Sequence, residues 1–419
     1  MFEVKGKFNT AIVYSNSREE KAIEQIRNLC DQDFTDGAKI RIMPDYHYGA
    51  GCTIGFTANL GNKVIPNLVG VDISCGILVV KLGKIKIDLE KLDDIMHRNI
   101  PSGFYSHKEP YIINEDIHDL SCFRELKKSH IFNRQIGTLG GGNHFSEINV
   151  DDEGDQYLVI HSGSRNLGKQ VADYHQNIAI ETLKGLGDLQ KLKTELIEKL
   201  KKDNQKHLIQ SSLKKLEKKF KDTKPKYPRD LCFLENENRT NYLDDMKICQ
   251  QYASLNRKTM ANIILGRMFN EAISQFEHFE TVHNYIDFKD NIIRKGAVSA
   301  YKDEKLIVPI NMRDGSILCT GKGNPEWNYS APHGAGRLMG RNEAKRTLNL
   351  EEFKNTMQDV YSTTVSANTL DEAPMAYKSM DEIIENIEPT VTIDKIIKPI
   401  YNFKSDQGNK YVKPNRRNM

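Results

Sequence analysis

The sequence predicts an α+β fold built from mixed sheets and packed helices. Short apolar runs typical of buried strands, such as Ile77–Val80 and Tyr157–Ile160, alternate with longer stretches whose apolar residues recur at helical spacing. The 419 residues exceed what one hydrophobic core usually covers, which predicts either two domains or one core with an insertion.

Composition is that of an ordinary soluble protein. Hydrophobic residues make up 38%, charged residues 28%, and the formal net charge is +3, so any signal for nucleic-acid binding must come from local charge. No N-terminal apolar segment and no 18-residue apolar run is present, so we expect neither secretion nor a membrane span. Seven cysteines, an odd number at scattered spacing, favour a reducing compartment. These features predict a cytoplasmic protein.

The chain opens with a strand and an amphipathic helix. Thr10–Tyr14 is the predicted strand. Ser17 and Glu20 have the spacing of a capping box, which predicts that the helix begins there. The apolar face of this helix is formed by Ala22, Ile23, Ile26 and Leu29.

A carboxylate and a thiol three residues apart lie between two apolar runs. Val64–Val69 leads into the glycine-flanked segment Gly70–Gly76 and Ile77–Val80 leads out of it, and both runs predict buried strands. Burying Asp72 or Cys75 alone costs several kcal/mol unless the group finds a partner or a metal. The alternative to a metal site is a turn aspartate beside a buried free thiol.

Four histidines follow in settings suited to a ligand. His144 comes directly after Gly140–Asn143, where consecutive glycines allow close approach of the backbone to a ligand. His161 ends a predicted strand, His283 follows another short apolar approach, and His333 precedes two nearby glycines. A lone histidine is more often structural, so the significance of these four depends on whether the fold brings them together.

The segment 184–226 differs from the rest of the chain. It holds 14 lysines and six acidic residues, a local net charge of +8, and its leucines recur at helical spacing. We expect a helical hairpin inserted in the core. Two interpretations stay open: a solvated basic face, or an arm that binds nucleic acid.

The remaining elements follow the same patterns. A long helix is expected from Asn241 to about Phe276, and Leu306–Pro309 predicts a strand. Residues 405–419 are expected to form a polar tail.

An ordered series of segments resembles one family, the RtcB-type RNA ligases. The segments are Met43–Gly49, Gly70–Gly76, Leu139–Glu147, His161–Gly168, His283-Asn284, His333–Arg337, Glu372–Lys378 and Lys398–Lys404. They span nearly the whole chain and leave out mainly the lysine-rich segment. The resemblance therefore implies one catalytic domain over residues 1–419, with 184–226 inserted in it.

The resemblance implies two manganese ions that share a thiolate. It assigns Asp72, Cys75 and His144 to one ion, while Cys75 bridges to a second ion that His161 and His283 complete. Ligand softness alone would favour zinc, so the choice of manganese comes from the resemblance. Two ions about 3.5–4 Å apart can clamp the attacking and leaving oxygens around phosphorus.

By the same resemblance, His333 attacks the α-phosphorus of GTP and carries GMP. The implied nucleotide-binding residues are Asn143, Glu147, His283, Asn284, Pro309, Ile310, Asn311, Met312, Ser316, Gly334, Ala335, Gly336, Tyr377 and Lys404. Candidates for RNA or phosphate contacts are Asp45, His47, Arg165 and Arg337.

The implied reaction joins a 2′,3′-cyclic phosphate or 3′-phosphate RNA end to a 5′-hydroxyl end, as in RNA repair or tRNA splicing. Two departures suggest a divergent branch, which we interpret as a dedicated repair ligase. Pro309–Met312 stands where the family usually has Pro-Gly-Ser-Met, so nucleotide affinity or selectivity is expected to be altered. The chain also continues for about fifteen residues beyond Lys404, and that tail could shade the pocket.

Two other functions are consistent with parts of this pattern. One is a metal-dependent cyclic phosphodiesterase that processes RNA ends without sealing them, which loss of His333 would favour. The other is a catalytically silent RNA-binding relative, which missing metal ligands would favour. His333 and all five implied ligands are present.

Overall fold

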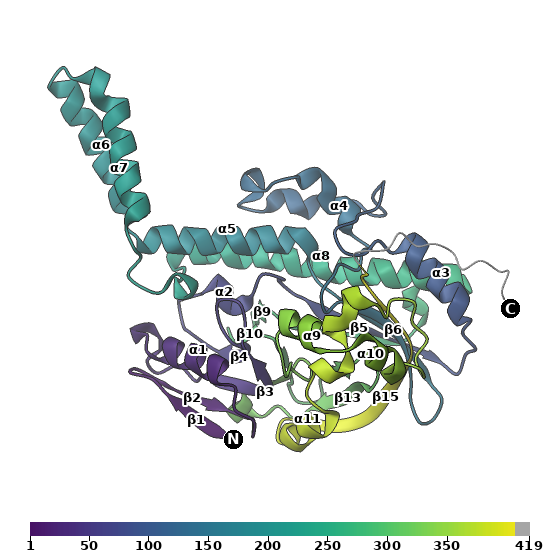
Figure 1. The fold of residues 1–419 in the computed structure, drawn as a ribbon. Coiled ribbons are helices and arrows are strands. Elements are labelled where there is room, and N and C mark those ends of the chain that lie inside the picture. Colours follow the sequence, from purple (N-terminus) through teal and green to yellow (C-terminus); the bar gives the residue numbers. More distant parts are fainter. Residues whose placement is uncertain (407–419) are drawn as a thin grey trace.

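Two large sheets and a long helix, α8, organise the chain (Figure 1). The computed structural model describes residues 1–406 and confirms an α+β architecture. A six-stranded sheet has the order β1-β2-β3-β4-β10-β9, a seven-stranded sheet has the order β12-β13-β15-β6-β7-β5-β8, and β11 pairs with β14. Most neighbours are antiparallel, whereas β2 and β3 are parallel, so the six-stranded sheet is mixed.

The strands are short except for β15. Their bounds are β1 Phe2–Lys5, β2 Thr10–Val13, β3 Arg41–His47, β4 Ile54–Ala58, β5 Gly76–Gly83, β6 Phe145–Val150, β7 Gln156–Ser162, β8 His278–Val282, β9 Tyr285–Ile286, β10 Ile293–Lys295, β11 Ala297–Ser299, β12 Lys305–Asn311, β13 Gly315–Gly321, β14 Ser330–Pro332 and β15 Val391–Lys404.

The helices range from single turns to the 34 residues of α8. Their bounds are α1 Glu20–Cys30, α2 Pro66–Val69, α3 Leu89–Asn99, α4 Phe132–Gln135, α5 Arg165–Leu183, α6 Leu186–Lys202, α7 Ile209–Asp222, α8 Asn236–Phe269, α9 Arg341–Thr347, α10 Leu350–Thr356 and α11 Met380–Ile387. Within residues 1–406, none of these helices combines the length and the apolar character needed to cross a membrane.

Helix α8 takes part in two hydrophobic cores. Its N-terminal half, including Met246 and Tyr252, packs with α5 and residues from the six-stranded sheet. Its C-terminal half, including Met260 and Ile264, packs with α3 and the seven-stranded sheet. Because both halves are buried, the helix cannot shift without disturbing both cores.

The register of the seven-stranded sheet brings four strand ends to one edge. Gly76, the first residue of β5, is paired with Ser162 at the end of β7 and with Val282 at the end of β8. Phe145, the first residue of β6, is paired with His161. Residues just outside these ends must therefore lie close together.

Three local predictions were wrong. Val64–Val69 is not a strand: it contains α2, which has Pro66 in its first turn, where a missing N–H does no harm. The capping box is absent, because α1 begins after Glu19 and the Ser17 hydroxyl instead lies 3.0 Å from that of Ser15. The long helix ends at Phe269, before a left-handed residue, Asn270.

The lysine-rich segment forms two helices, α6 and α7, that project from the end of α5 (Figure 1). At their base, the Lys226 N–H donates to the Leu183 carbonyl across 3.3 Å, so the two ends of the hairpin adjoin. None of its residues belongs to the hydrophobic core clusters of the described chain. Most of the predicted polar tail, residues 407–419, lies outside the described residues.

Candidate metal and nucleotide site

A buried thiol lies between two imidazoles at the edge described above. Cys75 Sγ is 3.3 Å from His144 Nε2 and 3.2 Å from His161 Nε2. His144 Nε2 is also 3.0 Å from Asp72 Oδ2. The three groups Cys75, His144 and His161 converge closely enough to share one ion.

His283 extends this group into a row of rings. The ring centroids of His161 and His283 are 5.2 Å apart, and those of His283 and His333 are 4.7 Å apart. Burial holds the pKa of both His161 and His283 well below its usual range, and the neighbouring histidines act in the same direction. Both rings are therefore neutral and can offer a lone pair.

The donor set suits metal binding. Asp72 Oδ1 is buried and has no hydrogen-bond partner among residues 1–406, which leaves an anionic oxygen to be satisfied. Burial alone would raise the pKa of Asp72, but the hydrogen bond and charge of His144 bring it below its usual range. His144 Nδ1 lies 2.8 Å from the Leu139 carbonyl, and donating there turns Nε2 toward Asp72 and Cys75.

Two glycines make room for this arrangement. A Cβ at Gly140 would collide with the guanidinium of Arg165 and with His144 Nδ1. A Cβ at Gly163 would collide with the carboxylate of Asp72. These positions therefore require glycine for reasons of space.

Helix α8 supports the segments that carry these residues through hydrogen bonds of Asn256 and Arg257. Arg257 is fully buried; its Nη1 donates to the carbonyls of Ser74 (3.0 Å) and Ser162 (2.9 Å), and its Nε donates to Glu280 (3.0 Å). Asn256 Oδ1 accepts from Gly137 N and Thr138 N, while its Nδ2 donates to Ser162 Oγ and the Gly163 carbonyl. The sequence prediction assigned neither residue a role; the signal it offered was a few polar and charged residues at otherwise apolar buried positions of the helix.

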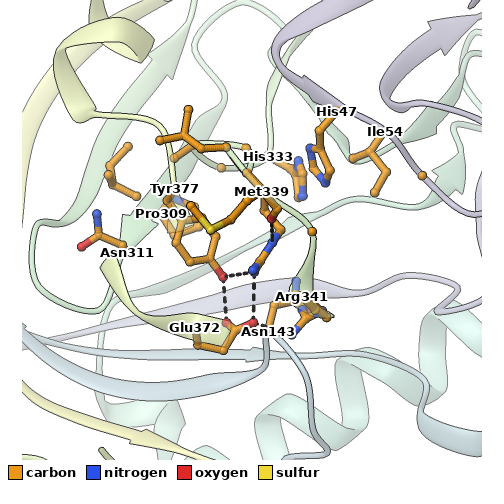
Figure 2. A pocket seen from close by; sticks show the side chains of 18 of the residues that line it. His47, Ile54, Asn143, Pro309, Asn311, His333, Met339, Arg341, Glu372 and Tyr377 are labelled. Carbon is orange, nitrogen blue, oxygen red and sulfur yellow. Dashed lines mark hydrogen bonds and ion pairs between the residues drawn. The ribbon is translucent and has the colours of Figure 1, made fainter. Parts of the chain in front are cut away.

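His161 is also one of the residues that line a cavity of about 960 Å³. Figure 2 shows side chains that line this cavity. Most of the residues expected to bind nucleotide line it: Asn143, Glu147, Pro309, Ile310, Asn311, Met312, Ser316, Gly334, Ala335, Gly336, Tyr377 and Lys404. His47, His333 and Arg337 also line it. The volume is that of a small-molecule site.

His333 is fixed by a buried carboxylate. Its Nδ1 lies 2.6 Å from Asp45 Oδ2, and its backbone N–H donates to the same oxygen across 3.1 Å. Asp45 is fully buried, so it is not exposed to contact RNA directly. This contact favours the tautomer with a proton on Nδ1, which leaves the Nε2 lone pair available.

His47 lies beside His333 (Figure 2). Its Nδ1 is 2.9 Å from the Asp45 carbonyl, and burial lowers its pKa to about 4. The ring is therefore neutral at physiological pH.

Glu147 is a buried residue of the cavity lining. Its two carboxylate oxygens accept from Asn402 (2.6 Å) and Asn149 (3.1 Å), yet burial raises its pKa to about 7. The nearby Ser316 hydroxyl is buried without a hydrogen-bond partner among the described residues. Both groups therefore have hydrogen-bonding capacity that a ligand could use.

An ionic network surrounds Glu372 at one end of the cavity (Figure 2). Tyr377 OH donates to Glu372 Oε2 across 2.8 Å, and Lys404 Nζ lies 2.9 Å from the same oxygen. Burial opposes ionisation of Glu372, but the positive charges of Lys404, Arg341 and Arg337 lower its pKa to about 2. Arg337 contacts Glu372, Tyr377 and the Asp371 carbonyl, so protein groups already occupy this candidate for phosphate binding.

Four of the residues expected to contact nucleotide or RNA do not line the cavity: His283, Asn284, Asp45 and Arg165. His283 and Asp45 lie in the contacts described above. Asn284 Nδ2 donates to the Asp72 carbonyl and its Oδ1 accepts from Gly296 N, so it supports the turn that carries Asp72 and Cys75. Arg165 lies on the Asp72 side, where it donates to Thr138 Oγ1 and to the Gly103 carbonyl.

Comparison with known proteins gives the same family over almost the whole described chain. The model of a family described as "tRNA-splicing ligase RtcB" matches residues 25–123 and 119–405. The chain belongs to the RtcB family. It is 29% identical over 408 residues to the "RNA-splicing ligase RtcB1" of Escherichia coli (strain ATCC 25922), covering 87% of this chain and 90% of that protein. It is 25% identical to the "tRNA-splicing ligase RtcB" of Nanoarchaeum equitans, with 85% of each chain covered.

The unusual segment of this RtcB-family protein, Pro309–Met312, has a structural explanation. Ile310 is the extra residue at a shift in the β12–β13 register, and its side chain packs in the core. Asn311 closes the turn by donating to Asp314 and accepting from the N–H groups of Arg313 and Asp314. Altered nucleotide use stays a prediction.

A second buried group with metal-binding residue types lies elsewhere in this RtcB-family chain. Cys122, His175 and Asp245 converge between α5 and α8. Asp245 already accepts from Ser121 N (2.6 Å), Ser121 Oγ (2.8 Å) and His175 Nε2 (2.7 Å). Unlike that of Asp72, this carboxylate is fully satisfied, so the group is explained as a structural hydrogen-bond network.

Proposed function

We propose that this protein is an RNA ligase that joins 2′,3′-cyclic phosphate or 3′-phosphate ends to 5′-hydroxyl ends, using GTP and manganese. The observation that carries the proposal is the position of His333. Its ring lies between the nucleotide-sized cavity and the row of buried imidazoles, and Asp45 turns its Nε2 away from the protein carboxylate. The names of the relatives, which describe splicing ligases for RNA or tRNA, support the same reaction class.

In the proposed first step, His333 Nε2 attacks the α-phosphorus of GTP. A P–N bond forms, the P–O bond to pyrophosphate breaks, and pyrophosphate leaves. Asp45 accepts a hydrogen bond from Nδ1–H and offsets the positive charge that develops on the ring. His47 is neutral and adds no repulsion against this charge.

The cavity wall would select the base. Glu147, as a carboxylate, can accept from the N–H groups of guanine, and Ser316 supplies a further hydroxyl. Tyr377 offers a ring face, held in place by its hydrogen bond to Glu372. Lys404, Asn143 and the backbone of Gly334–Gly336 complete the proposed pocket.

Two metal ions fit the remaining donors. Asp72, Cys75 and His144 would hold one ion, and Cys75, His161 and His283 would hold the other. When bound, such ions stabilise charge on the transferring phosphoryl group. Burial raises the pKa of the Cys75 thiol well above its usual range, so the thiolate form requires a cation nearby.

The later steps transfer GMP from His333 to RNA. Water opens a cyclic phosphate to a 3′-phosphate, whose oxygen then displaces His333 from the GMP phosphorus. The 5′-hydroxyl of the second end attacks the 3′-phosphate phosphorus, forms the phosphodiester and releases GMP. Activation is needed because an unactivated phosphate monoester has no good leaving group.

Incubation with GTP labelled at the α-phosphate and with manganese tests the proposal. We expect acid-labile label on the wild-type protein and none on His333→Ala. Cys75→Ala, which removes the proposed bridging ligand, should also lose labelling while remaining folded by circular dichroism. Labelling that is unchanged in His333→Ala would refute the assigned nucleophile; opening of cyclic phosphate ends without labelling or joining would indicate an end-processing enzyme.

We further propose that the catalytic unit is a single domain with residues 184–226 inserted, that the protein acts in the cytoplasm, and that RNA repair is its main role. The first point is supported by the sharing of α8 between two cores. The cytoplasmic location is supported by the composition and the scattered cysteines, and the repair role by the two departures from the family pattern.

A further inference from the structure

The loop after α3 presents an unusual group of exposed apolar side chains. Phe104 is 90% exposed and Tyr105 is 76% exposed. Tyr111 and Ile113, later in the same loop, are about half exposed. Large apolar groups gathered in this way on a soluble protein usually mark a contact surface.

The backbone that carries the two rings is fixed on both sides. Before them, Gly103 N–H donates to the Gly140 carbonyl (2.7 Å) and Leu139 N–H donates to the Pro101 carbonyl (2.9 Å). After them, the His107 N–H donates to the Arg134 carbonyl (2.9 Å), and His107 Nε2 lies 3.0 Å from the Gly137 carbonyl. The rings are therefore held at the surface by an ordered loop, which lowers the entropy lost when they bind a partner.

Through Gly103, the backbone of this loop adjoins Arg165, which lies next to the candidate metal ligands. Arg165 Nη2 donates to the Gly103 carbonyl, one residue before Phe104, across 2.7 Å. On its other side, the Arg165 guanidinium packs against Gly140, which also touches His144. The Asp72 carboxylate adjoins this region and its side chain is 30% exposed, so the cluster reaches solvent on this side.

This opening is distinct from the nucleotide cavity. The residues that line the cavity include His161 and His333 but not Asp72, Arg165 or Phe104. If GTP enters through the cavity, the Asp72 side remains for the RNA ends. Arg165 Nη1 has no hydrogen-bond acceptor among residues 1–406, so it can still donate to a phosphate.

We propose that Phe104 and Tyr105 form a stacking platform for a nucleobase of the RNA substrate, close to the reacting end. Base stacking on aromatic rings tolerates any sequence, as a ligase for broken RNA requires. Arg165 would hold a phosphate of the same nucleotide or of its neighbour. The inference rests on the proposed function, because it takes RNA as the ligand.

A second protein is the other occupant that such a patch could suit. We favour RNA because the patch adjoins Arg165 and the open side of Asp72, where an RNA end must lie to react. A purely apolar docking face would gain nothing from this position. The test separates the two occupants.

The test uses a single-stranded RNA with a 3′-phosphate and with 2-aminopurine at one of its last three nucleotides. Stacking should quench 2-aminopurine fluorescence when wild-type protein binds in the presence of manganese without GTP. In Phe104→Ala/Tyr105→Ala we expect the quenching to vanish and RNA affinity to fall about 5- to 150-fold for each stacked base. Phe104→Leu/Tyr105→Leu, which keeps apolar bulk without rings, should behave like the alanine variant.

Phe8→Ala, which removes an exposed aromatic ring from the turn between β1 and β2, is the matched control and should bind RNA like the wild type. Labelling by GTP should be normal in all three variants, because it needs no RNA. Normal labelling with unchanged quenching and affinity in the alanine variant would overturn the platform alone, whereas absent labelling in the wild type would overturn the proposed function. If the alanine variant binds RNA with the affinity of the wild type but sediments with a different coefficient, the patch is a protein contact and the platform is overturned.

Discussion

At the scale of single residues, two carboxylates in the site are buried in opposite electrostatic situations. Glu372 is surrounded by Lys404, Arg337 and Arg341, which lower its pKa to about 2. Glu147 is hydrogen-bonded mainly by neutral amides, and burial raises its pKa to about 7. The first is therefore a permanent anion that organises its neighbours, and the second can change protonation near neutral pH.

Asp45→Asn tests the role assigned to the carboxylate beside His333. Asparagine keeps the size of the side chain but removes the negative charge, and it can turn an N–H toward the ring and favour the wrong tautomer. We expect the single-turnover rate of labelling by GTP to fall about 10²- to 10⁴-fold, as for other histidines oriented by aspartate. Affinity for GMP should change little, and an unchanged labelling rate would refute the positioning role.

Glu147 predicts a pH dependence of base recognition. Its folded pKa of about 7 lies above the ordinary value of 4.5, so below pH 7 the carboxyl is protonated and must lose its proton to accept from both guanine N–H groups. Affinity for guanosine should therefore rise with pH and level off above about 7, with up to a tenfold change per unit below it. Guanosine carries no phosphate to titrate, and EDTA excludes pH-dependent metal binding, so calorimetry under these conditions measures the affinity for the base.

Glu147→Gln is the control for this prediction. An amide does not titrate, so the variant should bind guanosine more weakly at pH 8 and with little dependence on pH. The same pH profile in the variant and the wild type would show that another group is responsible.

At the scale of elements, the site is a consequence of strand register. β5 and β6 begin, and β7 and β8 end, at one edge of the seven-stranded sheet, so Cys75, His144, His161 and His283 meet although up to 208 positions separate them in the chain. Helix α8 then fixes the turn of Asp72 and Cys75 through Arg257. The sheet supplies the convergence and the helix supplies the rigidity.

Arg257→Met tests this support. The substitution removes a fully buried guanidinium that binds Ser74, Ser162 and Glu280, and it leaves the Glu280 charge without this partner. We expect the free energy of unfolding to fall by about 3 kcal/mol or more, measured by urea denaturation. Adding Glu280→Gln should recover part of the loss, because the double variant no longer holds the unpaired charge; full additivity of the two losses would contradict this account.

The sequence predicted the candidate site residues that the fold brings together, and its predictions failed where tertiary contacts decide the outcome. Glycine-flanked Asp, Cys and His residues at strand ends are local signals, and the family resemblance ordered them. The helix at Pro66 and the support by Arg257 depend on neighbours far along the chain. Arg337 appeared available for phosphate because its partners, Glu372 and Tyr377, lie 35 and 40 positions away.

At the scale of the whole molecule, α5 connects the site to the lysine-rich hairpin. The helix begins at Arg165, beside the candidate metal ligands, and ends at Leu183, at the base of α6 and α7 (Figure 1). Its 19 residues span about 28 Å at 1.5 Å per residue. At roughly 3.4 Å per phosphate, the spacing along one strand of a stacked double helix, an RNA held at the candidate metal ligands would reach the hairpin after about eight nucleotides.

The hairpin has the charge needed for such a contact. Of its 14 lysines, ion pairs within residues 1–406 engage Lys193 with Glu217 and Lys226 with Asp33, whereas Lys218 and Lys219 on α7 are exposed and form no ion pair with an acidic residue in that range. We therefore keep the interpretation of an RNA-binding arm as a proposal, against that of a solvated helical face. Its place at the far end of α5 assigns it to the body of the RNA and not to the broken ends.

Deleting residues 188–222 with a short linker tests this interpretation. The ends of the hairpin already adjoin and its residues lie outside the core clusters, so the protein should fold and GTP labelling of His333 should be unchanged. For RNAs that extend well beyond eight nucleotides from the break, affinity should fall, and the slope of log affinity against log salt should decrease by roughly 0.7 for each lost contact to a single strand. Shorter RNAs should bind as before.

Changing Lys214, Lys215, Lys218 and Lys219 to glutamine should reproduce the loss without removing the helices, because the contact is electrostatic. Equal affinity and equal salt slope for long RNAs in both variants would leave the hairpin as a solvated appendage.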